Sequence, residues 1–420
     1  MSEELEMKKR LYSLDIFRGI AIIMVIIFHR FMYDWPGVNF FFEEDTGFLM
    51  MPWLTAIMFF AGMGGIFSTI SGVVTSYSTY NRVSSGKGNK KMIFYAALFS
   101  FLWLTIVDYI RKFLFSTKSY WEPTDNYLYG IITGSLLEGT LVIPQLELLY
   151  YTSTLAIIGL SGFIVPTLMI LLSRKGGIEK VRRIKIIFGT LAAIILITTP
   201  FLSILLDPIV VDLFVSGNDL LGFLLALLVS PYFPIFPILA YALLGGIIGI
   251  SLARDEKKRN ITITWLVIGF ALLSIGNYIL ISALTRFSFY NYNFVRFMQL
   301  GVYIMIIIIL IRVIDLKPLE KQEKIAKKFK PVIMFGRASL TIFVFEAFLA
   351  TIFHVILNLI IPGWNTEPFV VLLFGIFNLA VWWIILHFWQ KKDFKGSIEW
   401  MGGYVVRKLS GFGRKEEDNK

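Results

Sequence analysis

The stretch RLYSLDIFRGIAIIMVIIFHRF, residues 10–31, decides the fold of this chain. It is long enough to cross a bilayer, because a membrane helix needs about 20 mostly apolar residues. Similar runs recur along the 420 residues, of which 56% are hydrophobic and 16% charged, with a mean hydropathy of +0.72. Soluble domains carry about 25% charged residues. The composition excludes a soluble single domain and predicts an all-α, polytopic integral membrane protein.

The apolar runs predict ten membrane helices. They cover residues 12–33, 48–72, 92–115, 146–173, 184–206, 232–253, 261–284, 294–314, 333–361 and 368–390. Basic clusters, such as residues 87–91 and 317–330, alternate with acidic or neutral connections. By the positive-inside rule both termini lie in the cytoplasm. The net charge of +11 therefore orients the chain in the plasma membrane and does not indicate a nucleic-acid partner.

Two segments do not fit a full span. Residues 116–145 contain a short apolar run interrupted by glycines, and residues 218–231 form a short apolar run followed by three prolines. Irregular backbone at membrane depth is tolerated only where protein buries it or where it lines a cavity. We expect both segments to be re-entrant or interfacial, with a surface amphipathic segment as the alternative.

The sequence predicts a single transmembrane domain over residues 1–390. A cytoplasmic, basic and amphipathic tail is predicted over residues 391–420. It has no cysteine, which excludes disulfides, thiol nucleophiles and thiolate metal ligands. The three histidines are His29, His354 and His387. With so few candidate ligands, we expect no metal centre.

The first helix carries three ionisable residues in an apolar surrounding: Asp15, Arg18 and His29. Ionisable groups inside a span cost a few kcal/mol each, about 2.5–3.5 on insertion scales, so they are rare and usually functional. Asp15 and Arg18 are three residues apart and can pair on one face. His29 follows Arg18 by eleven residues, which is about three whole turns plus 20°, so both lie on one stripe about 16 Å apart.

This stripe suits a long ligand with an anionic end at Arg18 and a reactive end at His29. A guanidinium is suited to phosphate, and a histidine to general-base chemistry near neutral pH. Gly19 offers a place where a ligand can approach the backbone. The structural alternatives are an Arg18 that reaches for headgroups and pairs with Asp15, and a His29 that lies at the interface without a catalytic part.

These residues resemble a known family. Asp15-x-x-Arg18-Gly19, with ten residues between the arginine and His29, resembles the first-helix motif of the acyltransferase 3 family. The same stretch is similar to the start of the heparan-α-glucosaminide N-acetyltransferases, which belong to the same transmembrane acyltransferase superfamily. Residues 51–72, 232–249, 335–348 and 394–400 resemble later segments of these or related families. The resemblance spans nearly the whole chain.

The resemblance implies an activity. Such proteins take an acyl group, usually acetyl, from cytosolic acyl-CoA and deliver it to a hydroxyl or amine across the membrane. It implies that His29 is catalytic and that Arg18, with Asp15 and Gly19 beside it, binds the CoA phosphates. The family often carries an Arg-x-x-Arg element near the third helix, where this chain has lysines. Lys90 and Lys91 are therefore the expected phosphate contacts there.

Further candidates lie in other spans. Glu346, within the ninth predicted helix, is expected to polarise His29 or to move a proton. The alternative is a structural carboxylate paired with Arg312 or Arg337. His354 is either a substitute for His29 or a hydrogen-bonded core residue.

Two further groups of ionisable residues are expected to have structural roles only. Asp108 and Arg111 read as an internal ion pair of the third helix. His387 reads as an interfacial residue at the end of the last predicted helix.

The predicted function is an integral membrane acyltransferase. It uses acyl-CoA, most simply acetyl-CoA, and an extracytoplasmic acceptor that is a glycan or a lipid-linked sugar, with membrane lipids around it. The alternative is a transporter or lipid-handling protein, favoured by the broken segment 218–253 and by the ionisable groups within the spans.

Overall fold

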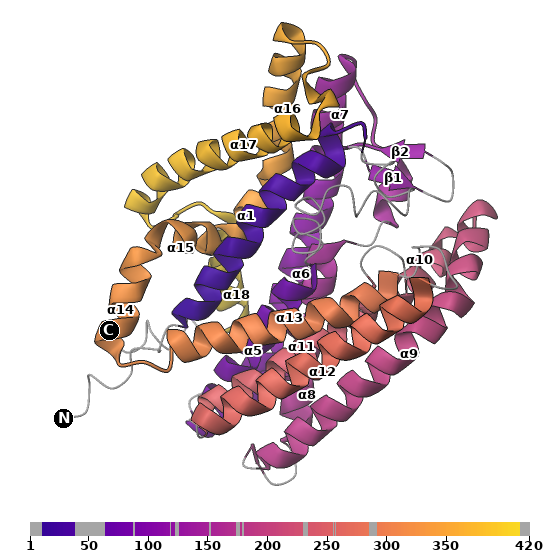
Figure 1. The fold of residues 1–420 in the computed structure, drawn as a ribbon. Coiled ribbons are helices and arrows are strands. Elements are labelled where there is room, and N and C mark those ends of the chain that lie inside the picture. Colours follow the sequence, from indigo (N-terminus) through magenta and orange to yellow (C-terminus); the bar gives the residue numbers. More distant parts are fainter. Residues whose placement is uncertain are drawn as a thin grey trace.

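The chain is almost entirely helical in its computed structural model (Figure 1). The structure describes residues 11–37, 64–86, 89–117, 119–121, 126–150, 153–173, 177–178, 180–229, 234–254, 256, 258–284 and 292–411.

The elements follow in chain order. The first half contains α1 (Tyr12–Asp34), α5 (Gly64–Ser84), α6 (Lys90–Phe115), β1 (Ser119–Trp121), β2 (Asn126–Leu128), α7 (Ile131–Glu138), η3 (Leu146–Leu149), α8 (Thr154–Leu172) and α9 (Val181–Val215). The second half contains α10 (Asp219–Val229), α11 (Ile235–Ala253), α12 (Lys258–Leu284), α13 (Tyr292–Val313), α14 (Leu319–Lys328), α15 (Lys330–Arg337), α16 (Ser339–Ile360), η4 (Trp364–Thr366), α17 (Pro368–Trp389), η5 (Gln390–Lys392) and α18 (Ile398–Ser410).

Seven stretches in the described part of the chain are long and apolar enough to cross a membrane. They contain α1, α6, α8, α9, α11, α16 and α17. The protein is therefore a polytopic membrane protein, as the composition predicts. The predicted span 48–72 lies outside the described residues as far as residue 63. The predicted spans 261–284 and 294–314 are helical, with described apolar stretches of Ile261–Gly276 and Phe297–Val313.

The two irregular segments contain short elements. Residues 119–128 contribute an antiparallel hairpin of β1 and β2, in which Tyr120 lies opposite Tyr127, and the eight-residue α7 follows. This hairpin departs from the all-α prediction. Residues 219–229 form α10, which packs along α9.

Three predicted helix boundaries are wrong. The span predicted to end at residue 72 continues as α5 to Ser84. The span predicted over 333–361 is two helices, α15 and α16, which meet at Ala338, whose backbone leaves the helical region (φ −110°, ψ 20°). The span predicted to end at residue 206 continues to Val215 through Pro200 and Pro208. Proline is tolerated in membrane helices where neighbouring groups satisfy the freed backbone carbonyls.

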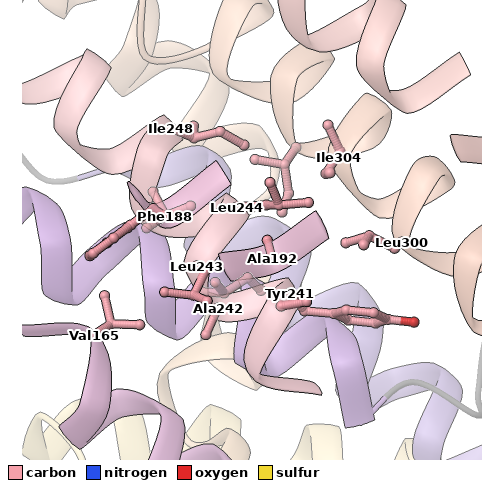
Figure 2. Packing of buried hydrophobic residues seen from close by; sticks show 14 of the residues in the cluster. Val165, Phe188, Ala192, Tyr241, Ala242, Leu243, Leu244, Ile248, Leu300 and Ile304 are labelled. Carbon is pink, nitrogen blue, oxygen red and sulfur yellow. The ribbon is translucent and has the colours of Figure 1, made fainter. Parts of the chain in front are cut away.

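The largest hydrophobic core surrounds α11, the most buried of the candidate spans. Figure 2 shows Tyr241 to Leu244 of α11 between Phe188 and Ala192 of α9 and Leu300 and Ile304 of α13. Because lipid is as apolar as these side chains, tight van der Waals packing holds such helices together.

Glycines bring α5 and α11 into close contact. A Cβ on Gly72 would lie 2.0 Å from the carbonyl oxygen of Ala242, and one on Gly249 would lie 2.3 Å from that of Val73. Gly245 meets the Thr69 carbonyl oxygen in the same way, at 2.2 Å. Gly245 and Gly249 are four residues apart, the small-residue spacing that lets membrane helices approach closely.

A second group of helices surrounds α1. In Figure 1, α1 lies beside α15, α16 and α17, and it contacts all three. Ile22 and Ile26 of α1 pack in a buried cluster with Ala338, Ile342 and Trp382. This packing sets α1 and α16 side by side, and these two helices carry most of the candidate site.

The C-terminal segment packs onto the helical bundle. Helix α18 contacts α6, where a Cβ on Gly402 would lie 2.5 Å from the indole nitrogen of Trp103. Glu399 of α18 accepts hydrogen bonds from the backbone N–H groups of Leu340 and Thr341 at 2.6 and 3.2 Å. It also accepts one from the Thr341 hydroxyl at 2.6 Å. A residue from the tail thereby caps the N-terminus of α16.

Candidate active site

The ionisable stripe of the first helix is intact. Helix α1 runs without a break from Tyr12 to Asp34, so Arg18 and His29 keep the spacing of about 16 Å along the axis. Arg18 Nη1 lies 3.8 Å from Asp15 Oδ1, which confirms that these two residues pair. The Arg18 side chain remains 29% exposed, so its guanidinium can still reach a further anion.

Helix α16 brings Glu346 to His29. Glu346 Oε1 hydrogen-bonds His29 Nδ1, and Glu346 Oε2 accepts from Arg30 Nη2 at 3.1 Å. An arginine stays charged in proteins, so the contact between Arg30 and Oε2 favours an ionised Glu346. Both oxygens of an ionised carboxylate can only accept hydrogen bonds. His29 Nδ1 then carries the hydrogen, which leaves Nε2 as the free basic nitrogen.

The partner of Glu346 corrects one alternative from the sequence. Neither Arg312 nor Arg337 pairs with it: Arg312 is exposed on α13, and Arg337 lies 4.0 Å from Asp393 and stacks on Phe394. Glu346 is instead buried against two residues of α1, with a side chain only 3% exposed.

A chain of alternating charges continues from Glu346 toward the C-terminal end of α1. Arg30, fully buried, also donates to Asp34 Oδ2 at 2.9 Å. Asp34 Oδ1 lies 2.9 Å from His354 Nδ1 of α16. The backbone carbonyl of Asp34 accepts from the side-chain amide of Asn365, so the η4 turn covers this end of the helix. Each buried charge thus has an opposite charge beside it, as the cost of burial requires.

Sequence reasoning missed Arg30 and Asp34. Asp34 lies just beyond the predicted span 12–33, whereas in the structure it is the last residue of α1 and is buried. The signal was available, because residues 30 and 34 have the i,i+4 spacing of a helical ion pair.

The third helix of the site is α6. Asp108 Oδ1 lies 3.3 Å from Arg111 Nη2, which confirms the predicted pair, and Asp108 Oδ2 lies 3.3 Å from Lys112 Nζ. Lys112 was not singled out from the sequence. The Arg111 guanidinium stacks 5.1 Å from the ring centroid of Phe343, on α16. Arg111 of α6 therefore faces the helix that carries Glu346, with Asp108 and Lys112 beside it.

Aromatic rings line the His29 imidazole. The Tyr33 ring centroid lies 5.2 Å away, and those of Phe28 and Phe343 lie 6.2 Å away. The His29 side chain is nevertheless 18% exposed, so a reacting molecule can reach it. A partly enclosed, aromatic environment strengthens the electrostatic interactions inside it.

Gly19 has a packing role in the structure. A Cβ at this position would lie 2.0 Å from the Val332 carbonyl oxygen, and one on Gly336 would lie 2.1 Å from the Asp15 carbonyl oxygen. The two glycines let the backbones of α1 and α15 touch. The backbone surface at Gly19, where we expected a ligand, is covered by α15.

The two candidate lysines lie at the start of α6. Lys90 Nζ donates to the carbonyl oxygen of Ser173, just after α8, at 3.2 Å. Lys91 is exposed, and its backbone N–H is capped by the Asn89 side chain. Lys91 is thus open to solvent, whereas Lys90 already binds a helix end.

The remaining histidine, His387, lies exposed near the end of α17, beside Gln390. Within the described ranges, no three histidine or acidic side chains gather in a way that could hold a metal ion.

Comparison with known proteins gives the family. The profile of the acyltransferase 3 family, described as an acyltransferase domain, matches residues 11–387. This range contains His29, Glu346 and every charged residue of the cluster around them. No curated protein matches the chain. Membership of this family implies acyltransferase activity with an acyl donor and an acceptor. The chain belongs to the acyltransferase 3 family of multi-pass membrane proteins.

Proposed function

We propose that this protein moves an acyl group, most simply acetyl, from cytosolic acyl-CoA to an acceptor on the far side of the membrane. The acceptor is a hydroxyl or amine of a glycan or lipid-linked sugar. The observation that carries the proposal is the buried hydrogen bond between His29 and Glu346, made by two helices that are far apart in sequence. Such a pair is what a general base with an orienting carboxylate requires.

His29 is the catalytic base in this proposal. Its Nε2 takes the proton of the acceptor hydroxyl or amine while the acceptor atom attacks the thioester carbonyl carbon. The tetrahedral intermediate then collapses, the carbon–sulfur bond breaks, and the CoA thiolate receives the proton from His29. Glu346 is the positioning residue: it fixes the tautomer of His29 and stabilises the imidazolium that forms between these two steps.

Arg18 is the proposed contact for the CoA phosphates. A guanidinium binds phosphate in bidentate geometry, and the exposed fraction of this side chain leaves it accessible. Asp15 holds the guanidinium from one side. The spacing of about 16 Å between Arg18 and His29 allows a long co-substrate to lie along α1. Lys91, with Lys90 beside it, offers a further positive charge for the nucleotide.

The proposal includes a topology of ten membrane crossings with both termini in the cytoplasm of a cell bounded by the plasma membrane. The alternation of basic and acidic connections supports it. With this orientation the start of α1 faces the cytosolic donor, and its end faces the acceptor. We propose that Gly19 serves helix packing and makes no contact with the ligand, because α15 covers its backbone.

The test is turnover of acetyl-CoA by the purified protein, with glucosamine or water as acceptor. Because the chain has no cysteine, released CoA is the only thiol, and a thiol reagent measures it directly. His29→Ala is expected to lower turnover by about 10²–10⁴-fold, the range for loss of a general base.

His387→Ala is the matched control, since this exposed histidine lies on α17 and is expected to keep wild-type turnover. Equal CoA release from wild-type protein and folded His29→Ala would overturn the proposed function.

A further inference from the structure

Helix α6 brings the positive charge of Arg111 to the site. Asp108 is a single carboxylate shared by two cations, Arg111 and Lys112. On the neighbouring helices, Glu346 and Asp34 share the charge of Arg30, and each also contacts one histidine. Arg111 therefore shares its carboxylate with Lys112 and keeps positive charge that an anion entering the site during the reaction can use.

Arg111 is the cation of this pair that a ligand can reach. Its side chain is 17% exposed, close to the 18% of His29, whereas the side chains of Lys112 and Asp108 are 4% and 1% exposed. His29 and Arg111, which both lie near Glu346, are thus the side chains here that remain partly exposed.

One donor of Arg111 is free. Its Nε is buried and has no hydrogen-bond partner among the described residues. The Nε of Arg30 also lacks a partner, but the Arg30 side chain is only 1% exposed and is sealed inside the cluster. A buried donor without a partner costs about 1–3 kcal/mol, so native structures rarely keep one without a use.

The same aromatic ring fixes Arg111 and His29 relative to each other. Phe343 of α16 lies 5.1 Å below the Arg111 guanidinium, and its ring centroid lies 6.2 Å from that of His29. Stacking on a ring holds a guanidinium in one plane and leaves its edge, where the N–H groups point, free to bind. Arg111 also acts electrostatically on Glu346, the partner of His29.

We infer that Arg111 binds the carbonyl oxygen of the acyl group and stabilises its negative charge in the tetrahedral intermediate. The inference rests on the proposed function and adds to it the group that polarises the thioester. When the acceptor attacks, the carbonyl π electrons move to oxygen, and a guanidinium N–H of Arg111 donates to that oxyanion. The electron pair on oxygen then re-forms the carbonyl double bond, the carbon–sulfur bond breaks, and the negative charge leaves on the CoA sulfur. Preorganised donors of this kind contribute more to the transition state than to substrate binding.

The experiment compares Arg111→Lys, Arg111→Met and Arg312→Met in acetyl-CoA turnover, each checked for folding by its thermal midpoint. Arg111→Met is expected to lower kcat by about 10²–10³-fold, the effect of removing one oxyanion donor, with KM for acetyl-CoA little changed. Arg111→Lys keeps the charge but loses the planar donor. Its kcat is expected to lie between that of the wild-type protein and that of Arg111→Met. Arg312→Met removes an exposed guanidinium of α13 that does not pair with Glu346, and it is expected to keep near wild-type kcat.

A second measurement separates catalysis from structure. Guanidinium ion at millimolar concentration is expected to restore part of the turnover of Arg111→Ala and none of that of His29→Ala. Wild-type kcat in a folded Arg111→Met protein, or an equal loss in Arg312→Met, would overturn the role of Arg111. That result leaves the proposed function standing if His29→Ala is inactive, whereas a wild-type protein without turnover contradicts the proposed function itself.

Discussion

At the scale of single residues, the site depends on which atom of His29 is free. Glu346 is held between His29 and Arg30, so neither carboxylate oxygen can turn away without leaving a buried charge unpaired. A fixed carboxylate keeps the hydrogen on His29 Nδ1. The function of Glu346 is therefore to orient and stabilise the base, and it needs a negative charge for that.

Glu346→Gln tests this role. The amide keeps the size of the side chain but can donate to Nδ1, which places the hydrogen on Nε2 and removes the base. We expect kcat to fall by about 10²–10⁴-fold, with the protein still folded. Acetyl-CoA turnover measures the change, and Glu320→Gln, an exposed carboxylate of α14, serves as the control. Undiminished turnover in Glu346→Gln would remove Glu346 from the mechanism.

At the scale of secondary-structure elements, α16 is the helix on which the site depends. It begins at Ser339, one residue after the break at Ala338, and it carries Phe343, Glu346 and His354. Hydropathy predicts no break in this region because residues on both sides of it are apolar. The break is stabilised by Glu399, which satisfies N–H groups that every helix leaves unpaired at its start. The C-terminal tail thus fixes where the helix of Glu346 begins.

Glu399→Ala tests this contact. The free energy of unfolding is expected to fall by about 1–2 kcal/mol, the effect of losing a helix cap, and the thermal midpoint falls with it. Glu367→Ala is a matched control, because Glu367 is the N-cap residue of α17 but makes no side-chain cap bond. A thermal midpoint that drops equally in both variants would mean that the cap on α16 adds no specific stability.

At the scale of the whole molecule, two groups of helices meet at α1. The group around α11 is held by glycine-mediated contacts and a large apolar core. The group of α15, α16 and α17 surrounds the other side of α1 and supplies the partners of His29 (Figure 1). The seven candidate spans define a multi-pass protein, and the proposed direction of transfer requires a definite orientation of these spans.

Cysteine labelling tests that orientation. The natural chain has no cysteine, so a single introduced thiol is the only target of a membrane-impermeant maleimide. In intact cells we expect labelling of Glu367→Cys, between α16 and α17, and none of Ser85→Cys, after α5, until the membrane is opened. Both positions are exposed, so access to the reagent is comparable. The opposite pattern would reverse the proposed topology.

The sequence by itself determined the membrane class and the register of Arg18 and His29. Both are local properties: a run of apolar residues must form a helix in lipid, and a helix repeats every 3.6 residues. The sequence left open whether Glu346 contacts His29 or pairs with Arg312 or Arg337, and only the tertiary structure decided between these alternatives. Glu346 is 317 positions away, and Arg111 comes from a third helix. Apolar helix faces resemble one another in hydropathy, so the pattern of one span does not say which other span packs against it. That choice depends on close contacts such as Gly19 with Val332 and Gly336 with Asp15, which exist only in the folded chain.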